Sequence, residues 1–338
     1  FVTGRRHHPW RRRIDWRLSE AFAASGASPL ERVSAALEAV LAAETPVFVP
    51  GERIAFTRTV ANLPELYTKM EWQAMRAARS FAEKGVVFNL CCDFGSTIAC
   101  GLERRRREVL ERCPAGEFRS AVLREIDAVL ALADRYRAAA ADAGLAEVAA
   151  TLAGVPRRGA ESFREALQFL RILHYVLWCE GEYHNGVGRF DQYLYPYLEK
   201  DLACGAETER SAFELLEEFF LTFHRDSDLY PGVQQGDNGQ SMVLGGCDSA
   251  GREASNLLTR MCLRASKELA VIDPKINLRV TKETPFELLE LGSELTAAGL
   301  GFPQYSNDEV VIDALRRWGY STGDARNYVV AACWEFTI

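Results

Sequence analysis

The chain has 338 residues, of which 48% are hydrophobic and 26% are charged, a composition typical of a soluble protein with a large core. Its 40 lysines and arginines and 47 aspartates and glutamates give a formal net charge of −7, which argues against a general affinity for nucleic acid or anionic membranes. Small molecules or proteins are therefore the expected partners.

No apolar stretch is long enough to cross a bilayer, and the basic segment 1–15 lacks the apolar region of a secretory signal. The nine cysteines are spread through predicted helices and strands, which fits reduced thiols in a reducing compartment. Only Cys91 and Cys92 are clustered, and no second Cys or His group stands at zinc-site spacing, so no structural zinc site is expected. Together these features predict a cytoplasmic protein.

The first half of the chain, about residues 16–180, is predicted to form a helical lobe because apolar residues recur at helical spacing. The clearest helix start is at Ser28, where serine can cap the helix, Pro29 suits the first turn and Glu31 completes a capping box.

Two more helical stretches follow in this half. One is expected over residues 118–150 with a break near Gly144, and an apolar helix is expected over residues 162–180. The run Arg104–Arg107 continues a helical pattern and is predicted to be an exposed helix surface with salt bridges.

The second half, about residues 181–338, is predicted to alternate short strands with helices. The expected strands are 241–244, 275–280, 302–305 and 328–332, and the expected helices are 252–269, 285–298 and 308–318. Such alternation implies crossover helices and an α/β sheet or barrel. Side chains that carry out chemistry then lie on loops that leave the strands.

The last predicted strand leads directly to a cysteine and a carboxylate, Cys333 and Glu335. In an extended segment, residues two apart point to the same side, so the thiol and the carboxylate are expected to face one space. Such a pair is a candidate for nucleophilic or radical chemistry with acid–base assistance. The alternative is a buried structural cysteine beside a surface glutamate.

Motifs along the chain resemble those of glycyl radical enzymes. The stretch from Gly188 to Tyr197, GRFDQYLYPY, with Asp201-Leu202 after it, strongly resembles the GRFDQYLYPYY…DL signature of that family. Further similar segments, in the same order, are Gly51–Ile54 with Arg58-Thr59, Pro274–Val280, Gly301–Asp308, and Gly319–Tyr328 leading to Cys333-x-Glu335. The chain from about residue 16 to its end is thus identified as a partial pyruvate formate-lyase-like domain.

The resemblance implies an incomplete ten-stranded α/β barrel, in which residues 181–338 form the first half-barrel beside the helical lobe. It implies that Cys333, on a central finger loop, loses a hydrogen atom to a glycyl radical and then abstracts hydrogen from the substrate. Glu335 corresponds to the family's acid–base carboxylate, and burial is expected to raise its pKa. The alternative is that Glu335 only bonds to the loop backbone.

The same resemblance points to four substrate-binding residues, Asp93, Tyr183, His184 and Trp334. Asp93 and His184 also have structural alternatives, as a helix N-cap and as an ordinary structural histidine. Asn89 stands where the family usually has a histidine, and Trp334 replaces a smaller residue. Trp334 either reshapes the pocket or packs against the barrel wall.

The residue before Cys333 is Ala332, so the two adjacent cysteines used for acyl transfer by pyruvate formate-lyases are absent. We therefore expect a radical lyase, dehydratase or decarboxylase. The open alternatives are formate C-acetyltransferase-type acyl transfer and a polar thiol enzyme in which Cys333 attacks an electrophile, with Glu335 or His184 as base. A non-catalytic scaffold subunit is the third class considered.

No glycine stands in the Arg-Val-Ser-Gly-Tyr context of the radical loop, and the chain ends at Ile338. The glycyl radical domain is thus expected to be absent and the isolated chain inactive. A full-length relative should be a homodimer that needs a radical S-adenosylmethionine activating enzyme, whose iron–sulfur cluster is not part of this chain. No bound metal or cofactor is therefore expected here.

Overall fold

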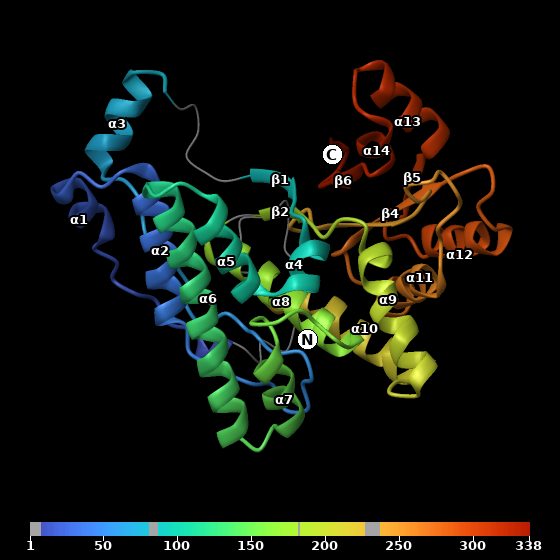
Figure 1. The fold of residues 1–338 in the computed structure, drawn as a ribbon, viewed down its shortest axis with the longest axis horizontal. Helices are drawn as coiled ribbons and strands as arrows, with labels where there is room; N and C mark the ends of the chain where they lie inside the picture. The colour runs from blue at the N-terminus through green and yellow to red at the C-terminus, as the bar shows by residue number, and fades with distance from the viewer. Residues whose placement is uncertain (1–7, 81–86, 182, 227–236) are drawn as a thin grey trace. The chain divides into compact units, whose positions relative to one another are not determined.

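The computed structural model describes residues 8–80, 87–181, 183–226 and 237–338 (Figure 1). These residues form two compact units. Unit 1 comprises described residues within 1–87, 97–160 and 168–182, and unit 2 those within 88–96, 161–167 and 183–338. Each unit is described separately below.

Unit 1 is predominantly helical, as expected. It contains the 3-10 helix η1 (His8–Trp10) and the helices α1 (Leu18–Ser25), α2 (Pro29–Ala43), α3 (Lys69–Ala77), α5 (Leu102–Arg112), α6 (Glu117–Asp142) and α7 (Ala146–Gly154). Two further helices, α4 (Phe94–Cys100) and α8 (Phe163–Cys179), have residues in both units.

Local signals explain where these helices begin and end. The Ser28 hydroxyl accepts the Glu31 backbone N–H at 3.2 Å, which confirms the predicted start of α2. The break between α6 and α7 contains Gly144 with φ +74°, a left-handed conformation that glycine adopts without steric cost. The Arg104 and Arg105 side chains pair with Glu108 on α5, which confirms the predicted salt-bridged surface.

Unit 2 is a mixed α/β unit. Its strands are β2 (Tyr183–Gly186), β3 (Ser241–Gly245), β4 (Lys275–Val280), β5 (Gln304–Asn307), β6 (Val329–Ala331) and β7 (Glu335–Thr337), and β1 (Val87–Cys91) has all but its first residue here. Its helices are α9 (Phe190–Cys204), α10 (Glu209–Arg225), α11 (Leu257–Leu269), α12 (Phe286–Ala297), α13 (Asp308–Arg317) and α14 (Thr322–Arg326).

The strands form three small sheets. The central one is parallel, in the order β3-β4-β5, and the others are the pairs β1-β2 and β6-β7. Helix α11 connects β3 to β4 and α12 connects β4 to β5, and Figure 1 shows both helices beside β4 and β5. The predicted α/β class with crossover helices is therefore confirmed, and strand 275–280 has the predicted bounds.

Strands β3 and β4 of the central sheet are buried on both faces, because every residue of β3 and the four inner residues of β4 are buried, whereas β5 has exposed residues. Alternate residues of β4 share a face, so Lys275, Asn277 and Arg279 point the same way. Val243 of β3 packs in one apolar cluster with Tyr328 and residues of β6. This packing places the last hairpin of the chain against the parallel sheet.

No helix in the described parts of the chain combines the length and the apolar character that a bilayer span requires.

Candidate active site

The cysteine and the glutamate of the predicted pair lie at the tip of a β-hairpin. The strand predicted over 328–332 is shorter, because β6 ends at Ala331 and the chain reverses through Ala332, Cys333 and Trp334 into β7. Ala332 has φ +46°, in the left-handed region that few non-glycine residues adopt. The expectation that Cys333 lies in an extended segment is therefore wrong, and its side chain is exposed on the turn.

The carboxylate of Glu335 folds back over this turn. Its Oε2 atom accepts the backbone N–H groups of Cys333 and Trp334, each at 3.0 Å. Partial burial raises the pKa of Glu335, but these N–H donors and the nearby His184 lower it more, and the net pKa lies below the usual value. The expected net rise by burial is therefore not found, and the backbone-bonded arrangement considered as the alternative is present.

A histidine lies close to this carboxylate. The Nδ1 atom of His184 on β2 is 3.0 Å from Oδ1 of Asn89 on β1. Because an amide oxygen can only accept, Nδ1 carries the hydrogen and Nε2 is the acceptor in the neutral ring. Burial lowers the pKa of His184 and the charge of Lys275 adds to this, while the negative charges of Glu335 and Asp237 oppose it. The net lowering favours the neutral imidazole.

The His184 ring is held tightly by its surroundings. A Cβ atom on Gly239 would lie 2.1 Å from Cδ2 of the ring, so only glycine leaves room for it there. His184 itself has φ +65°, a strained conformation for a non-glycine residue. Strain of this kind is concentrated at functional sites. It makes His184 a stronger candidate for a substrate-binding residue than its sequence position alone suggested.

A cavity of about 320 Å³ adjoins the hairpin within unit 2. It is lined by Cys91, Cys92, Asp93, Phe94, Gly95, Gly188, Arg189, Gln192, Tyr193, Asn327, Val329, Thr337 and Ile338. Val329 and Thr337 are cross-strand partners in the hairpin. Because residues two apart in a strand share a face, Glu335 projects on the same face of β7 as Thr337.

Asp93 lines this cavity and also begins a helix. Its carboxylate accepts the Ser96 backbone N–H at 3.1 Å, directly before Phe94, the first residue of α4. The capping alternative is therefore present, and the cavity position leaves a substrate contact open as well.

The two remaining predicted site residues differ in what the structure says of them. Trp334 is 62% exposed, so its side chain does not pack into a wall of the described structure. The Tyr183 side chain lies outside the described residues.

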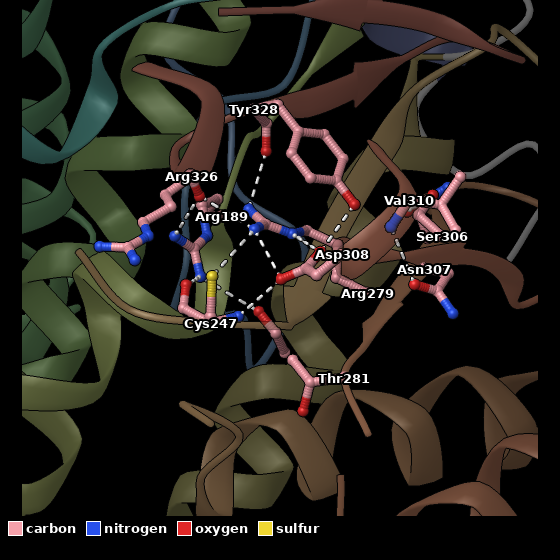
Figure 2. A network of polar contacts seen from close by, with 12 residues as sticks. Arg189, Cys247, Arg279, Thr281, Ser306, Asn307, Asp308, Val310, Arg326 and Tyr328 are labelled. Carbon is pink, nitrogen blue, oxygen red and sulfur yellow. Dashed lines mark hydrogen bonds and ion pairs between the residues drawn. The ribbon is translucent and has the colours of Figure 1, made fainter. Parts of the chain in front are cut away.

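A buried polar network, shown in Figure 2, lies next to the hairpin and was not found by sequence reasoning. It joins Arg279 at the end of β4, Asp308 at the start of α13, and Tyr328 directly before β6. Arg189 contributes through hydrogen bonds to backbone carbonyls, and the shortest of them, to the Cys247 oxygen, is 2.7 Å. The sequence signals for it were Arg279, near the end of the predicted strand 275–280, and Asp308, the first residue of the predicted helix that follows the strand 302–305.

Among the described residues, no group of three or more His, Cys, Asp or Glu side chains is arranged to hold a metal ion.

Comparison with protein families decides the membership of the chain. The family model described as "Pyruvate formate lyase-like" matches residues 62–338. The chain belongs to this family. The resemblance seen in the sequence motifs is thereby confirmed for most of the chain.

Named members of the pyruvate formate lyase-like family align with part of the chain. The (2S)-3-sulfopropanediol dehydratase of Klebsiella oxytoca is 31% identical over 192 residues, 55% of this chain and 23% of that protein. The isethionate sulfite-lyase of Nitratidesulfovibrio vulgaris is 29% identical over 275 residues, 72% of this chain and 33% of that protein. The aligned part is thus at most about a third of these relatives.

The fold of this family member agrees with solved structures. A structure concerning 1,2-propanediol dehydration in Roseburia inulinivorans matches 95% of this chain with 26% identity and a TM-score of 0.81. The B12-independent glycerol dehydratase from Clostridium butyricum has the same fold, with a TM-score of 0.79. The chain spans about half of each of these structures, 51% in both cases.

Proposed function

We propose that the full-length protein is a glycyl radical lyase or dehydratase, in which Cys333 is the hydrogen-atom carrier and Glu335 the acid–base group. The observation that carries the proposal is the hairpin tip, where an exposed thiol and a carboxylate are held on one turn by two 3.0 Å hydrogen bonds. Membership of the pyruvate formate lyase-like family supports it.

The residues at the tip fit the chemistry of a glycyl radical. Such a radical supplies a hydrogen-atom acceptor, which converts a thiol into a thiyl radical when the sulfur is within reach. The exposed side chain of Cys333 on the turn supports this role. Its sulfur then takes one hydrogen atom from a substrate carbon and later returns one to the product radical, so the cysteine is unchanged after each turnover.

Glu335 removes a proton from the hydroxyl group beside the substrate radical. Its lowered pKa keeps it ionised at neutral pH, which is the form that accepts a proton. Deprotonation pushes electron density toward the neighbouring carbon and expels the leaving group. Where the leaving group is hydroxide, protonated Glu335 passes it the proton, so that water forms and the carboxylate is regenerated. The names dehydratase and sulfite-lyase of two relatives describe removal of water or sulfite from a substrate. We therefore infer a small substrate with a hydroxyl group next to such a leaving group.

Asp93, Tyr183, His184 and Trp334 are proposed to bind this substrate. Asp93 lines the cavity beside the hairpin, and the neutral His184 ring near Glu335 offers Nε2 as an acceptor for a substrate hydroxyl. We further propose that the units form the helical lobe and first half-barrel of a ten-stranded barrel. The proposed partners are a radical S-adenosylmethionine activating enzyme and a second copy of the full-length protein.

The test uses the full-length protein matured without oxygen by its activating enzyme. Electron paramagnetic resonance should show a glycyl doublet, and Cys333→Ser should keep the doublet but lose turnover. Glu335→Gln keeps an oxygen for the two N–H donors, so the hairpin should persist while kcat falls by about 10²- to 10⁴-fold. Full turnover in Cys333→Ser contradicts the proposal.

A polar thiol enzyme remains the second candidate, because an exposed cysteine beside a carboxylate also suits nucleophilic attack. Activity in air, without any radical signal, would favour it. Acyl transfer of the formate C-acetyltransferase type would require another thiol next to Cys333, where Ala332 and Trp334 stand.

A further inference from the structure

The hairpin that carries Cys333 has few backbone connections to the rest of unit 2. Where the structure describes the chain, the backbone of β6 is laddered to β7 alone. Side-chain hydrogen bonds and packing therefore hold the hairpin on the parallel sheet. They act on the segment that runs from Arg326 to Val330, directly before the cysteine turn.

Tyr328 is the centre of this attachment. Its hydroxyl donates to Oδ1 of Asp308 at 2.8 Å, and its ring lies under the Arg279 guanidinium, 4.0 Å from Cζ to the ring centroid. Phe336 of β7 meets the same ring edge-on, with 5.6 Å between centroids. Tyr328 and Arg279 are fully buried, and Asp308 is 2% exposed. The tyrosine thus links the hairpin to two strand ends of the sheet.

Arginine side chains hold the backbone on either side of Tyr328. Arg279 donates to the carbonyl oxygens of Tyr328 at 3.0 Å and Arg326 at 2.9 Å, as Figure 2 shows. Arg189 also donates to the Arg326 carbonyl, at 3.3 Å. Ser241 of β3 donates its hydroxyl to the Val330 carbonyl at 2.7 Å. The segment is therefore held at three successive alternate carbonyls.

Asp308 fixes the orientation of this arrangement. Its two oxygens accept Nε and Nη2 of Arg279, each at 2.8 Å, and Oδ2 also accepts the Cys247 backbone N–H. Burial raises the pKa of Asp308, but these bonds and the Arg279 charge outweigh it and leave the pKa below its usual value. A bidentate, buried ion pair of this kind has one preferred geometry, so the tyrosine hydroxyl meets a rigid partner.

We propose that Tyr328, held by Asp308 and Arg279, is a positioning residue that sets where the Cys333 sulfur lies for hydrogen-atom transfer. This inference rests on the proposed function of Cys333. The chain between Tyr328 and the cysteine is a short strand and a turn, so a change in the anchor moves the tip. Hydrogen-atom transfer needs the reacting atoms close together, and misplacement by about 1 Å can slow a reaction by about 10²-fold.

The test needs no knowledge of the substrate. In D2O the thiol carries deuterium, so repeated transfer between Cys333 and the glycyl carbon replaces hydrogen by deuterium there and collapses the doublet to a singlet. Tyr328→Phe removes only the hydroxyl. In the full-length, anaerobically matured protein we expect unchanged radical content and a Tm within about 3 °C of wild type. Collapse of the doublet should be at least about 10-fold slower.

The matched control is Tyr320→Phe, which removes a hydroxyl from a tyrosine that is 46% exposed in the same unit, and it should exchange like wild type. If Tyr328→Phe does not mature, Ser241→Ala tests the same anchoring through the Val330 carbonyl and should also slow the exchange. Exchange at the wild-type rate in whichever of the two variants matures overturns the inference.

Failure of the proposed function has a different signature. If wild type and Cys333→Ser lose the doublet in D2O at the same rate, Cys333 is not the hydrogen carrier, whatever Tyr328 does. A rate that depends on Cys333 but not on Tyr328 or Ser241 overturns only the positioning role.

Discussion

The contact between His184 and Asn89, together with the lowered pKa of the ring, favours a neutral imidazole with its hydrogen on Nδ1. The amide oxygen accepts from Nδ1 at 3.0 Å, and burial lowers the pKa of the ring. The charged groups that act on the ring are Glu335, Lys275 and Asp237. Asn89 therefore matters less as a missing family histidine than as the partner that orients another histidine.

Replacing this amide by a carboxylate should reverse the charge preference of the ring. In Asn89→Asp, a negative charge near Nδ1 favours the imidazolium, so the pKa of His184 should rise by at least about one unit. Histidine NMR titration of the chain measures this, and the difference from His184→Gln assigns the signal. Asn89→Leu is the control, which removes the acceptor without adding charge and should leave the pKa below the usual value.

The same shift predicts a change in stability with pH. In wild type the folded chain binds the His184 proton more weakly than the unfolded chain, so this group lowers stability as the pH falls below the unfolded pKa. Asn89→Asp should remove that loss. An unchanged dependence between pH 5 and about 7 would contradict the assignment of the hydrogen bond.

The geometry around Cys333 and Glu335 differs from the one that the sequence predicted. Cys333 and Glu335 do share one turn, but they do so because Glu335 accepts two backbone N–H groups, and not because they alternate along a strand. No local pattern marks Ala332 for its left-handed conformation. The Asn89 contact joins residues far apart in the sequence, so spacing could not reveal it.

At the scale of the elements, the loop after β3 depends on a glycine. Gly246 has φ +73°, and a Cβ there would lie 2.7 Å from Arg279 side-chain atoms and 2.8 Å from Asp308 Oδ2. Gly205, after α9, has the same φ of +73° but open space around its Cβ position. Comparing Gly246 with Gly205 therefore separates the cost of the left-handed backbone from the cost of steric crowding.

We expect Gly205→Ala to lower the free energy of unfolding by about 1 kcal/mol, because only the left-handed backbone is penalised. Gly246→Ala should lower it by about 1–3 kcal/mol more, because the methyl group must displace the Arg279–Asp308 pair. Urea unfolding of both variants measures the difference. Equal losses would mean that the loop moves away from the pair at little cost.

The bounds of the elements show which sequence signals were sufficient. Strand β4 was predicted residue for residue. Helix α11 was expected from Arg252 but begins at Leu257, because the Asn256 side chain accepts the Thr259 N–H and caps it there. Strand β5 was expected from Phe302 but begins at Gln304, after a proline that has no N–H to donate. Strand β1 was missed because the first half of the chain was predicted to be helical, β2 because it is short and polar, and β7 because it follows an unexpected turn.

At the scale of the whole molecule, each unit contains a buried arginine–carboxylate pair. In unit 1, Glu44 and Arg58 are paired at 2.6 Å, and both side chains are at most 2% exposed. Oε2 of Glu44 also accepts the Thr59 hydroxyl and backbone N–H. Arg58 donates to the Trp178 carbonyl. This pair joins segments of unit 1 that are distant in the sequence.

Removing one partner should therefore destabilise the chain strongly. Glu44→Ala leaves a buried guanidinium without its carboxylate, and we expect a loss of about 3–5 kcal/mol in the free energy of unfolding. Glu38→Ala is the control in the same unit, because it removes a carboxylate from an exposed ion pair. The Glu38 side chain is 56% exposed, and its Oε2 atom lies 3.6 Å from Nε of Arg124. This control should change stability by less than about 1 kcal/mol. Thermal and urea unfolding distinguish the two, and similar losses would contradict the assigned role of Glu44.

The sequence predicted the α/β class and the family from ordered motifs, such as the one starting at Gly188, but not how the motifs contact each other. Arg279 and Asp308 belong to separate motif segments, and the structure brings them to one ion pair around Tyr328. Such contacts depend on strand register, here Arg279 opposite Ser306, which single-sequence patterns do not encode.

The exposed indole of Trp334, next to Cys333 in the chain, can also serve as an optical probe of the hairpin tip. Tryptophan emission moves to shorter wavelength when water is excluded, and Trp334, at 62% exposure, has most of its surface left to cover. With the similarly exposed Trp318 changed to phenylalanine, a blue shift would report directly when a small molecule or another polypeptide closes over the hairpin tip.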